Sequence, residues 1–122
     1  MAKTILIVDD SASLRQIVAI ALKGAGYDVI EAGDGKDGLS KLDGIKVNLI
    51  ISDVNMPVMD GLTMVTEIKK MPNYKFTPII MLTTEAGSDL KMRGKAAGVK
   101  AWVVKPFKPD QMLDAVSKLI AP

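Results

Sequence analysis

With 122 residues, of which 48% are hydrophobic, the chain is long enough to bury the core of one domain and too short for two. The absence of cysteine excludes a disulfide framework and a thiolate metal site, and it makes the cytoplasm the expected location. The formal net charge is only +2, but residues 1–60 hold six basic and nine acidic side chains, whereas residues 86–122 hold seven basic and three acidic ones.

Two classes of partner are not expected from this composition. Charge asymmetry can indicate nucleic-acid binding, yet no basic stripe with interleaved aromatic residues is present, and the chain has only one tryptophan, two tyrosines and two phenylalanines. The N-terminus lacks the apolar core of a signal peptide, and every apolar run is far shorter than the roughly 18 residues of a membrane span. We therefore expect a protein that binds neither nucleic acid nor membrane.

The chain begins with an apolar run over residues 4–8, which predicts a buried strand. A helix follows, with Ser11 or Ser13 as its cap and with Gly24 and Gly26 at its end. Five apolar side chains of this helix share one stripe: Leu14, Ile17, Val18, Ala21 and Leu22. The first strand and helix thus form one βα unit.

The middle of the chain predicts two further βα units. Residues 27–31 alternate like a half-exposed edge strand, and residues 34–43 predict a short helix. The apolar run 47–52 predicts a buried strand, and residues 61–70 predict a helix, which Pro72 closes because proline disfavours helical geometry at the residue before it.

The last two βα units begin with the apolar runs 77–82 and 100–104, which predict strands. Residues 87–98 predict the least stable helix, because Gly94 interrupts a thin apolar face. The final helix starts near Pro109 and is strongly amphipathic. Its apolar side is formed by Met112, Leu113, Val116, Leu119 and Ile120.

Strand and helix alternate five times, which is typical of the α/β class. We predict a doubly wound parallel sheet of five strands in the order 2-1-3-4-5, the flavodoxin-like (βα)5 arrangement, as a single domain over residues 1–122. Four of the strands, all but residues 27–31, should be buried on both faces. In this arrangement ligands bind beyond the carboxyl ends of the strands, beside the switch point between strands 1 and 3.

Four predicted strands are followed by residues that suit a phosphoryl-transfer site: Asp9 and Asp10, Asp53, Thr83, and Lys105. Parallel strands bring these endings to one edge of the sheet. Lys105 could neutralise a carboxylate at rest and a phosphoryl oxygen afterwards, and the Thr83 hydroxyl could hydrogen-bond an anionic oxygen. Taken singly, each residue has an ordinary alternative as a helix cap, a surface charge or a strand-end threonine.

The three aspartates also favour a divalent cation, because carboxylates brought close together repel one another and are costly to bury unpaired. The chain has neither histidine nor cysteine, so the ligands would all be oxygens. Such a set favours Mg²⁺, or Mn²⁺, over zinc. The alternative is a group of capping or surface aspartates without an ion.

The chain resembles the response-regulator receiver domain over its whole length. The resemblance rests on four motifs: Val8-Asp9-Asp10, Asp53-Val54-Asn55-Met56-Pro57 with Asp60-Gly61, Thr83, and Lys105-Pro106-Phe107. Within the family it looks most like the stand-alone CheY type, since it ends after the fifth predicted helix with no output domain.

The resemblance implies a role for each strand-end residue. Asp53 would accept a phosphoryl group from a CheA-like sensor histidine kinase, and Lys105 would bind a phosphoryl oxygen. Asp10, Asp53 and the backbone carbonyl of Asn55 would hold Mg²⁺, with Asp9 acting mostly through water. Thr83 would move toward the phosphate, and the Lys105-Pro106 bond would be cis.

Trp102 stands where the family has a rotating aromatic residue that follows the threonine inward, and its ordinary alternative is an aromatic that packs the sheet edge. Thr84 replaces a residue that is usually small, while Asn55 and Glu85 stand where the family tunes the phosphoryl lifetime. One face gathers four lysines around the indole: Lys91, Lys95, Lys100, Trp102 and Lys118. It is either the docking face for an acidic, partly apolar partner such as a flagellar motor switch, or a merely solvated basic face.

The chemistry implied is in-line phosphoryl transfer, in which the domain promotes its own phosphorylation and dephosphorylation without being an enzyme for an external substrate. A chain without histidine needs its phosphoryl donor from another protein or a small acyl phosphate. We expect a monomer, with a phosphatase as a further partner.

Three rival functions remain on the sequence. A stand-alone phosphorelay receiver, which passes phosphate to another histidine, shares every motif. A haloacid dehalogenase-like phosphatase needs a second acid two residues after its aspartate, where Asn55 stands. A flavodoxin-like electron carrier would have a hydroxyl- and glycine-rich loop after strand 1, where Asp9 and Asp10 would instead repel a flavin phosphate.

Overall fold

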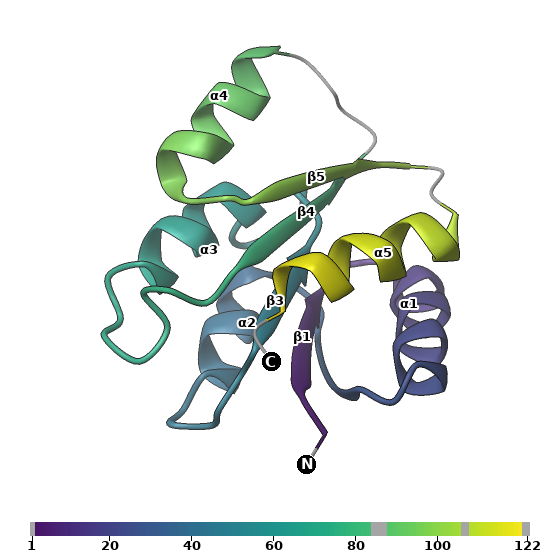
Figure 1. The fold of residues 1–122 in the computed structure, drawn as a ribbon. Coiled ribbons are helices and arrows are strands. Elements are labelled where there is room, and N and C mark those ends of the chain that lie inside the picture. Colours follow the sequence, from purple (N-terminus) through teal and green to yellow (C-terminus); the bar gives the residue numbers. More distant parts are fainter. Residues whose placement is uncertain (1, 84–87, 106–107, 121–122) are drawn as a thin grey trace.

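The computed structural model describes residues 2–83, 88–105 and 108–120. Ten elements alternate along the chain (Figure 1). They are β1 (Thr4–Val8), α1 (Ala12–Gly24), β2 (Asp28–Ala32), α2 (Gly35–Lys41), β3 (Leu49–Ser52), α3 (Gly61–Ile68), β4 (Ile79–Thr83), α4 (Ser88–Ala97), β5 (Ala101–Val104) and α5 (Pro109–Leu119). All ten were predicted from the sequence, but several are shorter than expected.

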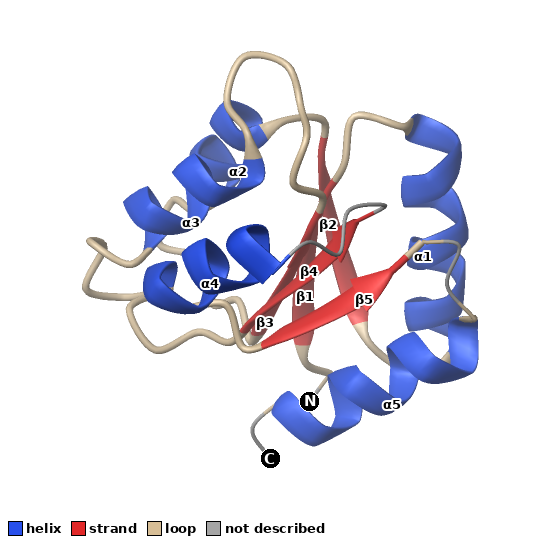
Figure 2. Cartoon of the chain, turned by 90° about the horizontal axis from the view of Figure 1, so that it is seen from above, coloured by secondary structure: helices blue, strands red, loops and turns tan. Residues whose placement is uncertain are grey.

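The five strands form one parallel sheet in the order β2-β1-β3-β4-β5, which confirms the predicted topology. Helices cover both faces of the sheet: α1 and α5 lie on one side, and α2, α3 and α4 lie on the other (Figure 2). The neighbouring central strands β1 and β3 lead to helices on opposite faces, which opens the crevice at their carboxyl ends.

Side-chain alternation along the strands divides the core into two layers. In β1, Ile5 and Ile7 belong to the layer beneath α1 and α5, whereas Leu6 and Val8 belong to the layer beneath α2 and α3. Strands β1, β3 and β4 are buried almost throughout, as expected. The same expectation is wrong for β5, whose residues are partly or largely exposed because β5 is the edge of the sheet and pairs only with β4.

Ser11 caps the start of helix α1: its side chain accepts a hydrogen bond from the Leu14 N–H and thereby satisfies a free donor of the first turn. Its buried residues are Val18, Ala19 and Leu22. Ile17, which the sequence places in the apolar stripe, is 54% exposed. The helix is therefore rotated so that Ala19, not Ile17, faces the sheet.

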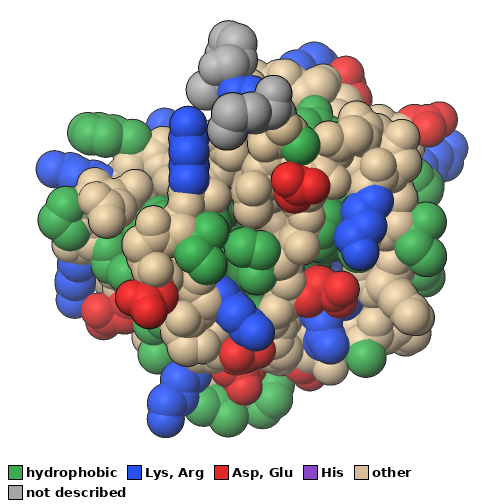
Figure 3. Space-filling model, turned by 90° about the horizontal axis from the view of Figure 1, so that it is seen from below, with side chains coloured by type: hydrophobic (Ala, Val, Ile, Leu, Met, Phe, Trp, Pro, Cys, Tyr) green, Lys and Arg blue, Asp and Glu red, His purple; other side chains and the backbone are tan. Residues whose placement is uncertain are grey.

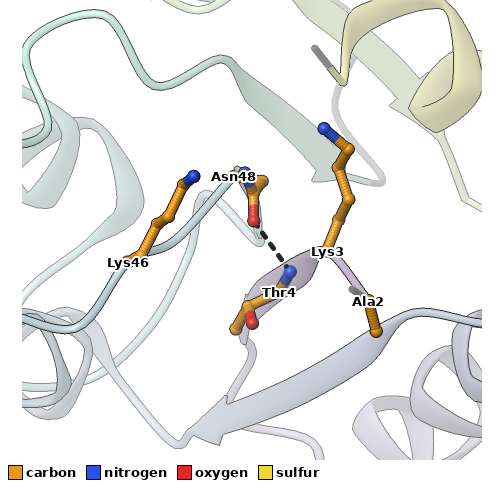
Figure 4. Close-up of a pocket in the computed structure, with 5 residues that line it drawn as sticks. All are labelled: Ala2, Lys3, Thr4, Lys46 and Asn48. Carbon is orange, nitrogen blue, oxygen red and sulfur yellow. Dashed lines mark hydrogen bonds between the residues drawn. The ribbon is translucent and has the colours of Figure 1, made fainter. Parts of the chain in front are cut away.

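The first residue of β1 is hydrogen-bonded to the residue directly before β3, on the face of the molecule that Figure 3 shows from below. Asn48 accepts a hydrogen bond from the Thr4 N–H at 2.9 Å, in a hollow that Lys3 and Lys46 also line (Figure 4). Figure 3 shows basic, acidic and apolar side chains interspersed over this face. Among the described residues, no helix combines the length and apolar character needed to span a membrane.

Candidate functional site

The predicted site residues lie at the carboxyl ends of four neighbouring strands, with Thr83 as the last residue of β4 and the others directly after β1, β3 and β5. Backbone hydrogen bonds extend the sheet by one residue at three of them: Asp9 N–H to Ala32 C=O (3.1 Å), Asp53 N–H to Val8 C=O (2.9 Å), and Lys105 N–H to Thr83 C=O (2.7 Å). The sheet itself thus fixes the backbone positions from which Asp9, Asp53 and Lys105 project.

Three carboxylates meet at this edge. Each of Asp9, Asp10 and Asp53 offers an oxygen that lies within 4.8 Å of those of the other two. Asp9 is buried, with 3% of its surface exposed, Asp53 is partly buried, and Asp10 lies open to solvent. The cluster is therefore reached from the solvent on the Asp10 side.

Lys105 lies between the two more buried acids. Its Nζ is 3.2 Å from Oδ2 of Asp9 and 3.2 Å from Oδ2 of Asp53. The side chain of Lys105 is only 14% exposed. A single ammonium thus faces two carboxylates in a partly desolvated pocket, which leaves the negative charge incompletely balanced.

The environment of Asp53 shifts its titration. Burial raises the pKa of the Asp53 carboxyl above its usual range, and the Asp9 carboxylate raises it further, while Lys105 acts in the opposite direction. A carboxyl that resists ionisation in the resting protein gains from any added cation at this position. The raised pKa of Asp53 and the excess of carboxylates over ammonium groups therefore both indicate that the site favours a further cation.

Backbone donors orient the acids. Oδ1 of Asp9 accepts a hydrogen bond from the Ser11 N–H at 2.9 Å, and Oδ1 of Asp53 accepts one from the Val54 N–H at 2.7 Å. The Oδ2 atoms of both residues are left toward Lys105. Carboxylate oxygens held in this way, with Asp10 beside them, fit a hard cation such as Mg²⁺ or Mn²⁺.

Two further residues shape the site and were not predicted to do so. The Arg15 guanidinium donates a hydrogen bond to the Asp9 backbone C=O at 2.6 Å and pairs with Glu31 at 3.4 Å. Gly61 begins α3 so close to Asp53 that a Cβ there would collide with the Asp53 carbonyl oxygen. The Asp60-Gly61 motif in the sequence could have indicated that Gly61 belongs to the site, whereas nothing in the sequence of α1 indicates this for Arg15.

Thr83 and Trp102 lie on one face of the sheet. In the β4–β5 register Thr83 is paired with Val104 and Met81 with Trp102, so these four side chains point the same way. Thr83 is fully buried, and Trp102 is partly buried against the core layer that α2 and α3 cover. Trp102 thus lies on the neighbouring strand β5, level with Met81, two residues before the level of Thr83.

Other predicted site residues are placed less fully. Asn55 lies at the exposed start of the loop after Asp53. Thr84, Glu85 and the dipeptide Pro106-Phe107, including the expected cis bond, lie outside the described residues.

A hollow between α4 and β5 is lined by Lys91, Lys95, Gly98, Val99, Lys100 and Trp102. The structure therefore brings together three of the four predicted lysines and the indole. Lys118 does not line this hollow and pairs instead with Asp114 of α5 at 2.9 Å.

Comparison with known proteins gives consistent matches. The family model described as the response regulator receiver domain matches residues 5–117. Chemotaxis protein CheY1 of Helicobacter pylori is 37% identical over 118 residues, which make up 95% of each chain. The structure of chemotaxis protein CheY4 of Vibrio cholerae superposes with a TM-score of 0.95 at 45% identity, covering 98% of this chain and all of that one (100%).

A fourth match concerns a receiver domain with metal. The receiver domain of a sensor histidine kinase from Pseudomonas aeruginosa PAO1, with a magnesium ion coordinated in its active-site cleft, superposes with a TM-score of 0.89 at 26% identity and covers 98% of both chains.

Proposed function

The chain belongs to the response regulator receiver domain family, and from this premise we propose that it is a phosphorylation-activated switch in which Asp53 accepts a phosphoryl group from a sensor histidine kinase. The observation that carries the proposal is the position of Lys105, 3.2 Å from both Asp9 and Asp53 in a pocket that Asp10 opens to solvent. A carboxylate nucleophile beside a cation that can accept new phosphoryl charge is the arrangement that this transfer needs.

In the transfer, an Asp53 carboxylate oxygen forms a bond to phosphorus while the bond from phosphorus to the donor's imidazole nitrogen breaks. The imidazole takes up a proton as it leaves. Lys105 neutralises charge on the phosphoryl oxygens, and in doing so its ammonium shifts from the carboxylate toward the phosphoryl group. The backbone N–H of Val54 keeps Asp53 oriented throughout.

Asp10, Asp53 and the backbone carbonyl of Asn55 would hold Mg²⁺, or Mn²⁺, with Asp9 acting mostly through water. The bound cation supplies positive charge that offsets the three acids and the incoming phosphoryl group. The proximity of the three carboxylates supports this proposal, as does the magnesium ion in the related receiver domain from Pseudomonas aeruginosa.

Phosphorylation adds close to two negative charges beside the Thr83 end of β4. The Thr83 hydroxyl moves toward the phosphoryl oxygens, and Trp102 changes its packing with it. The two side chains share a face of the sheet, which supports this coupling. The signal then reaches the surface of α4, β5 and α5, where three lysines and the indole line one hollow.

An acidic, partly apolar protein segment is the partner that suits this hollow. Since CheY1 and CheY4 are chemotaxis proteins, we place the chain in chemotaxis, with control of a flagellar motor switch as its output. It acts in the cytoplasm as a monomer that promotes its own phosphorylation and dephosphorylation, with a phosphatase as a further partner.

A phosphorelay role is the second candidate, because one matched receiver domain is part of a sensor histidine kinase. In that role Asp53 would pass its phosphoryl group to a histidine of another protein. The phosphatase alternative is disfavoured, because Asn55 cannot supply the general acid that hydrolysis of an ester needs.

The experiment adds Mg²⁺ and a small acyl phosphate to the wild type and to Asp53→Asn, and then weighs the intact proteins. We expect one added phosphoryl group on the wild type and none on the variant. An unchanged wild-type mass, or equal added mass on both, would refute Asp53 as the acceptor. Transfer of the phosphoryl group from the phosphorylated protein to a separate histidine-containing phosphotransfer domain would favour the relay.

A further inference from the structure

Gly94 lies at the end of the second turn of α4 and is buried. Apart from proline, glycine is the weakest helix former, so its presence in the middle of a helix needs a reason. A Cβ built on Gly94 would fall far inside van der Waals contact with Cζ2 of Trp102, and it would lie 3.1 Å from both Cε2 and Cη2 of the same indole. The benzene ring of Trp102 thus occupies the space that a side chain at position 94 would take.

The backbone of Gly94 also closes the turn that leads from α4 into β5. Its C=O accepts a hydrogen bond from the Val99 N–H at 2.8 Å, and the Lys95 C=O accepts one from the Gly98 N–H at 3.1 Å. Gly98 has a φ of +103°, so the three features together form a Schellman motif. The turn holds Gly94 at a fixed position relative to the strand that carries Trp102.

Trp102 is therefore in contact with two elements at once. Its strand register places it on the same face as Thr83, and its ring rests on the backbone of α4. Because the ring is rigid, it cannot leave this seat by a small adjustment, and any reorientation of the indole changes its contact with α4.

We propose that Gly94 is the positioning residue for Trp102: the missing side chain at position 94 is the seat of the indole, and this contact links the orientation of Trp102 to α4. The signalling half of this inference rests on the proposed function, since it assumes that phosphorylation of Asp53 alters Trp102. The seating half concerns the unphosphorylated protein alone.

The seating half predicts that Gly94→Ala changes the melting temperature in opposite directions in the presence and absence of the indole. Gly94→Ala in the Trp102 background should lower the melting temperature by about 3 °C or more, because the new methyl group collides with the ring. Phenylalanine has no counterpart of the Trp102 atoms Cζ2 and Cη2, so in the Trp102→Phe background we expect the collision to be relieved and the same alanine to raise the melting temperature through its better helix propensity. Gly24→Ala, where nothing lies within 4 Å of the built Cβ, is the matched control and should act alike in both backgrounds.

A variant that does not fold is also informative. If Gly94→Ala fails to fold and Trp102→Phe rescues it, the seat is confirmed. If alanine at position 94 has the same effect in both backgrounds, or if the double variant also fails to fold, the proposal is overturned, because position 94 would then need glycine for a reason unrelated to the indole.

The signalling half is read from the NMR signal of the Trp102 indole N–H after treatment with Mg²⁺ and a small acyl phosphate, with the phosphoryl mass measured on the same samples. Gly94→Ala should take up the wild-type phosphoryl mass but show a different phosphorylation-induced shift. An equal mass with an unchanged shift would overturn this half. If the wild type takes up no phosphoryl group, the proposed function fails, and the sign reversal still decides whether Gly94 seats Trp102.

Discussion

The Nζ of Lys105 lies 3.2 Å from Oδ2 of Asp53, across the carboxyl edge of the sheet. The two residues are far apart in the chain and come together because β3, β4 and β5 are neighbouring parallel strands. The same ammonium lies 3.2 Å from Asp9, so one cation serves two acids. The unphosphorylated site therefore favours binding of a second cation, and Lys105 can move from a carboxylate to a phosphoryl oxygen.

The first prediction concerns Lys105→Met. Without the ammonium, Asp9 and Asp53 face each other in a partly buried pocket, and we expect the free energy of unfolding to fall by roughly 2–3 kcal/mol in the absence of divalent cations. Added Mg²⁺ should recover part of this loss. Urea denaturation with and without Mg²⁺ measures both effects.

The matched control is Lys118→Met, which removes a lysine that pairs with Asp114 at 2.9 Å but is 72% exposed. We expect a change within about 0.5 kcal/mol, since exposed ion pairs contribute little. Equal losses for the two variants would contradict the special position of Lys105.

The second prediction concerns the pH dependence of stability at Asp53. Its folded-state pKa is raised, chiefly by burial. The folded protein therefore holds this proton more tightly than the unfolded chain, and the contribution of Asp53 to stability is fully present below the unfolded pKa and lost as the pH rises through the folded pKa. Metal-free Asp53→Asn should thus be more stable than the wild type at pH 7, and the difference should shrink on acidification. A wild type more stable than the variant at pH 7 would show that the pair with Lys105 outweighs burial.

The third prediction concerns the metal. Asp10→Asn removes one of the three carboxylates at the solvent side of the cluster, and we expect Mg²⁺ affinity to fall at least about tenfold. Isothermal titration calorimetry measures the change. Asp28→Asn, an exposed acid at the start of β2, is the control and should bind Mg²⁺ like the wild type. Wild-type affinity in Asp10→Asn would remove this residue from the proposed ligand set.

The fourth prediction concerns Gly61→Ala. The new Cβ would collide with the Asp53 carbonyl oxygen and would lie 2.8 Å from Cε of Met81, so α3 must shift away from β3. We expect a loss of about 2–3 kcal/mol in stability and slower phosphorylation, because Asp53 moves with its carbonyl. Denaturation and intact mass check the two effects, with Gly24→Ala as the unhindered control. A stable variant that is phosphorylated at the wild-type rate would contradict the role of this close approach.

The fold could be predicted because the apolar runs mark the strands directly. The site followed from it, since Asp9, Asp53 and Lys105 come directly after strands whose ends meet. The rotation of α1 could not be predicted, because Ile17 and Ala19 are both apolar and only the packed helix shows which one faces the sheet. The partial exposure of β5 was missed for a different reason: the predicted strand order already places this strand at the edge, but its apolar run was interpreted as burial on both faces.

Close approaches between elements were also beyond the sequence. Gly94 looked like a defect in a weak helix, and only its contact with Trp102 gives a reason for glycine there. Nothing in the sequence distinguishes Arg15, whose guanidinium reaches back to the Asp9 carbonyl. Both contacts depend on the exact distance between a helix and the sheet, which side-chain periodicity does not encode.

The central claim is that phosphorylation of Asp53 changes the environment of Trp102. Its most direct test uses this residue, the only tryptophan in the sequence. The NMR signal of its indole N–H is recorded on the wild type and on Asp53→Asn, with Mg²⁺, before and after addition of a small acyl phosphate. The account predicts that the signal moves in the wild type and stays in place in the variant. A wild-type signal that stays in place while the intact mass shows a phosphoryl group on the protein would contradict it.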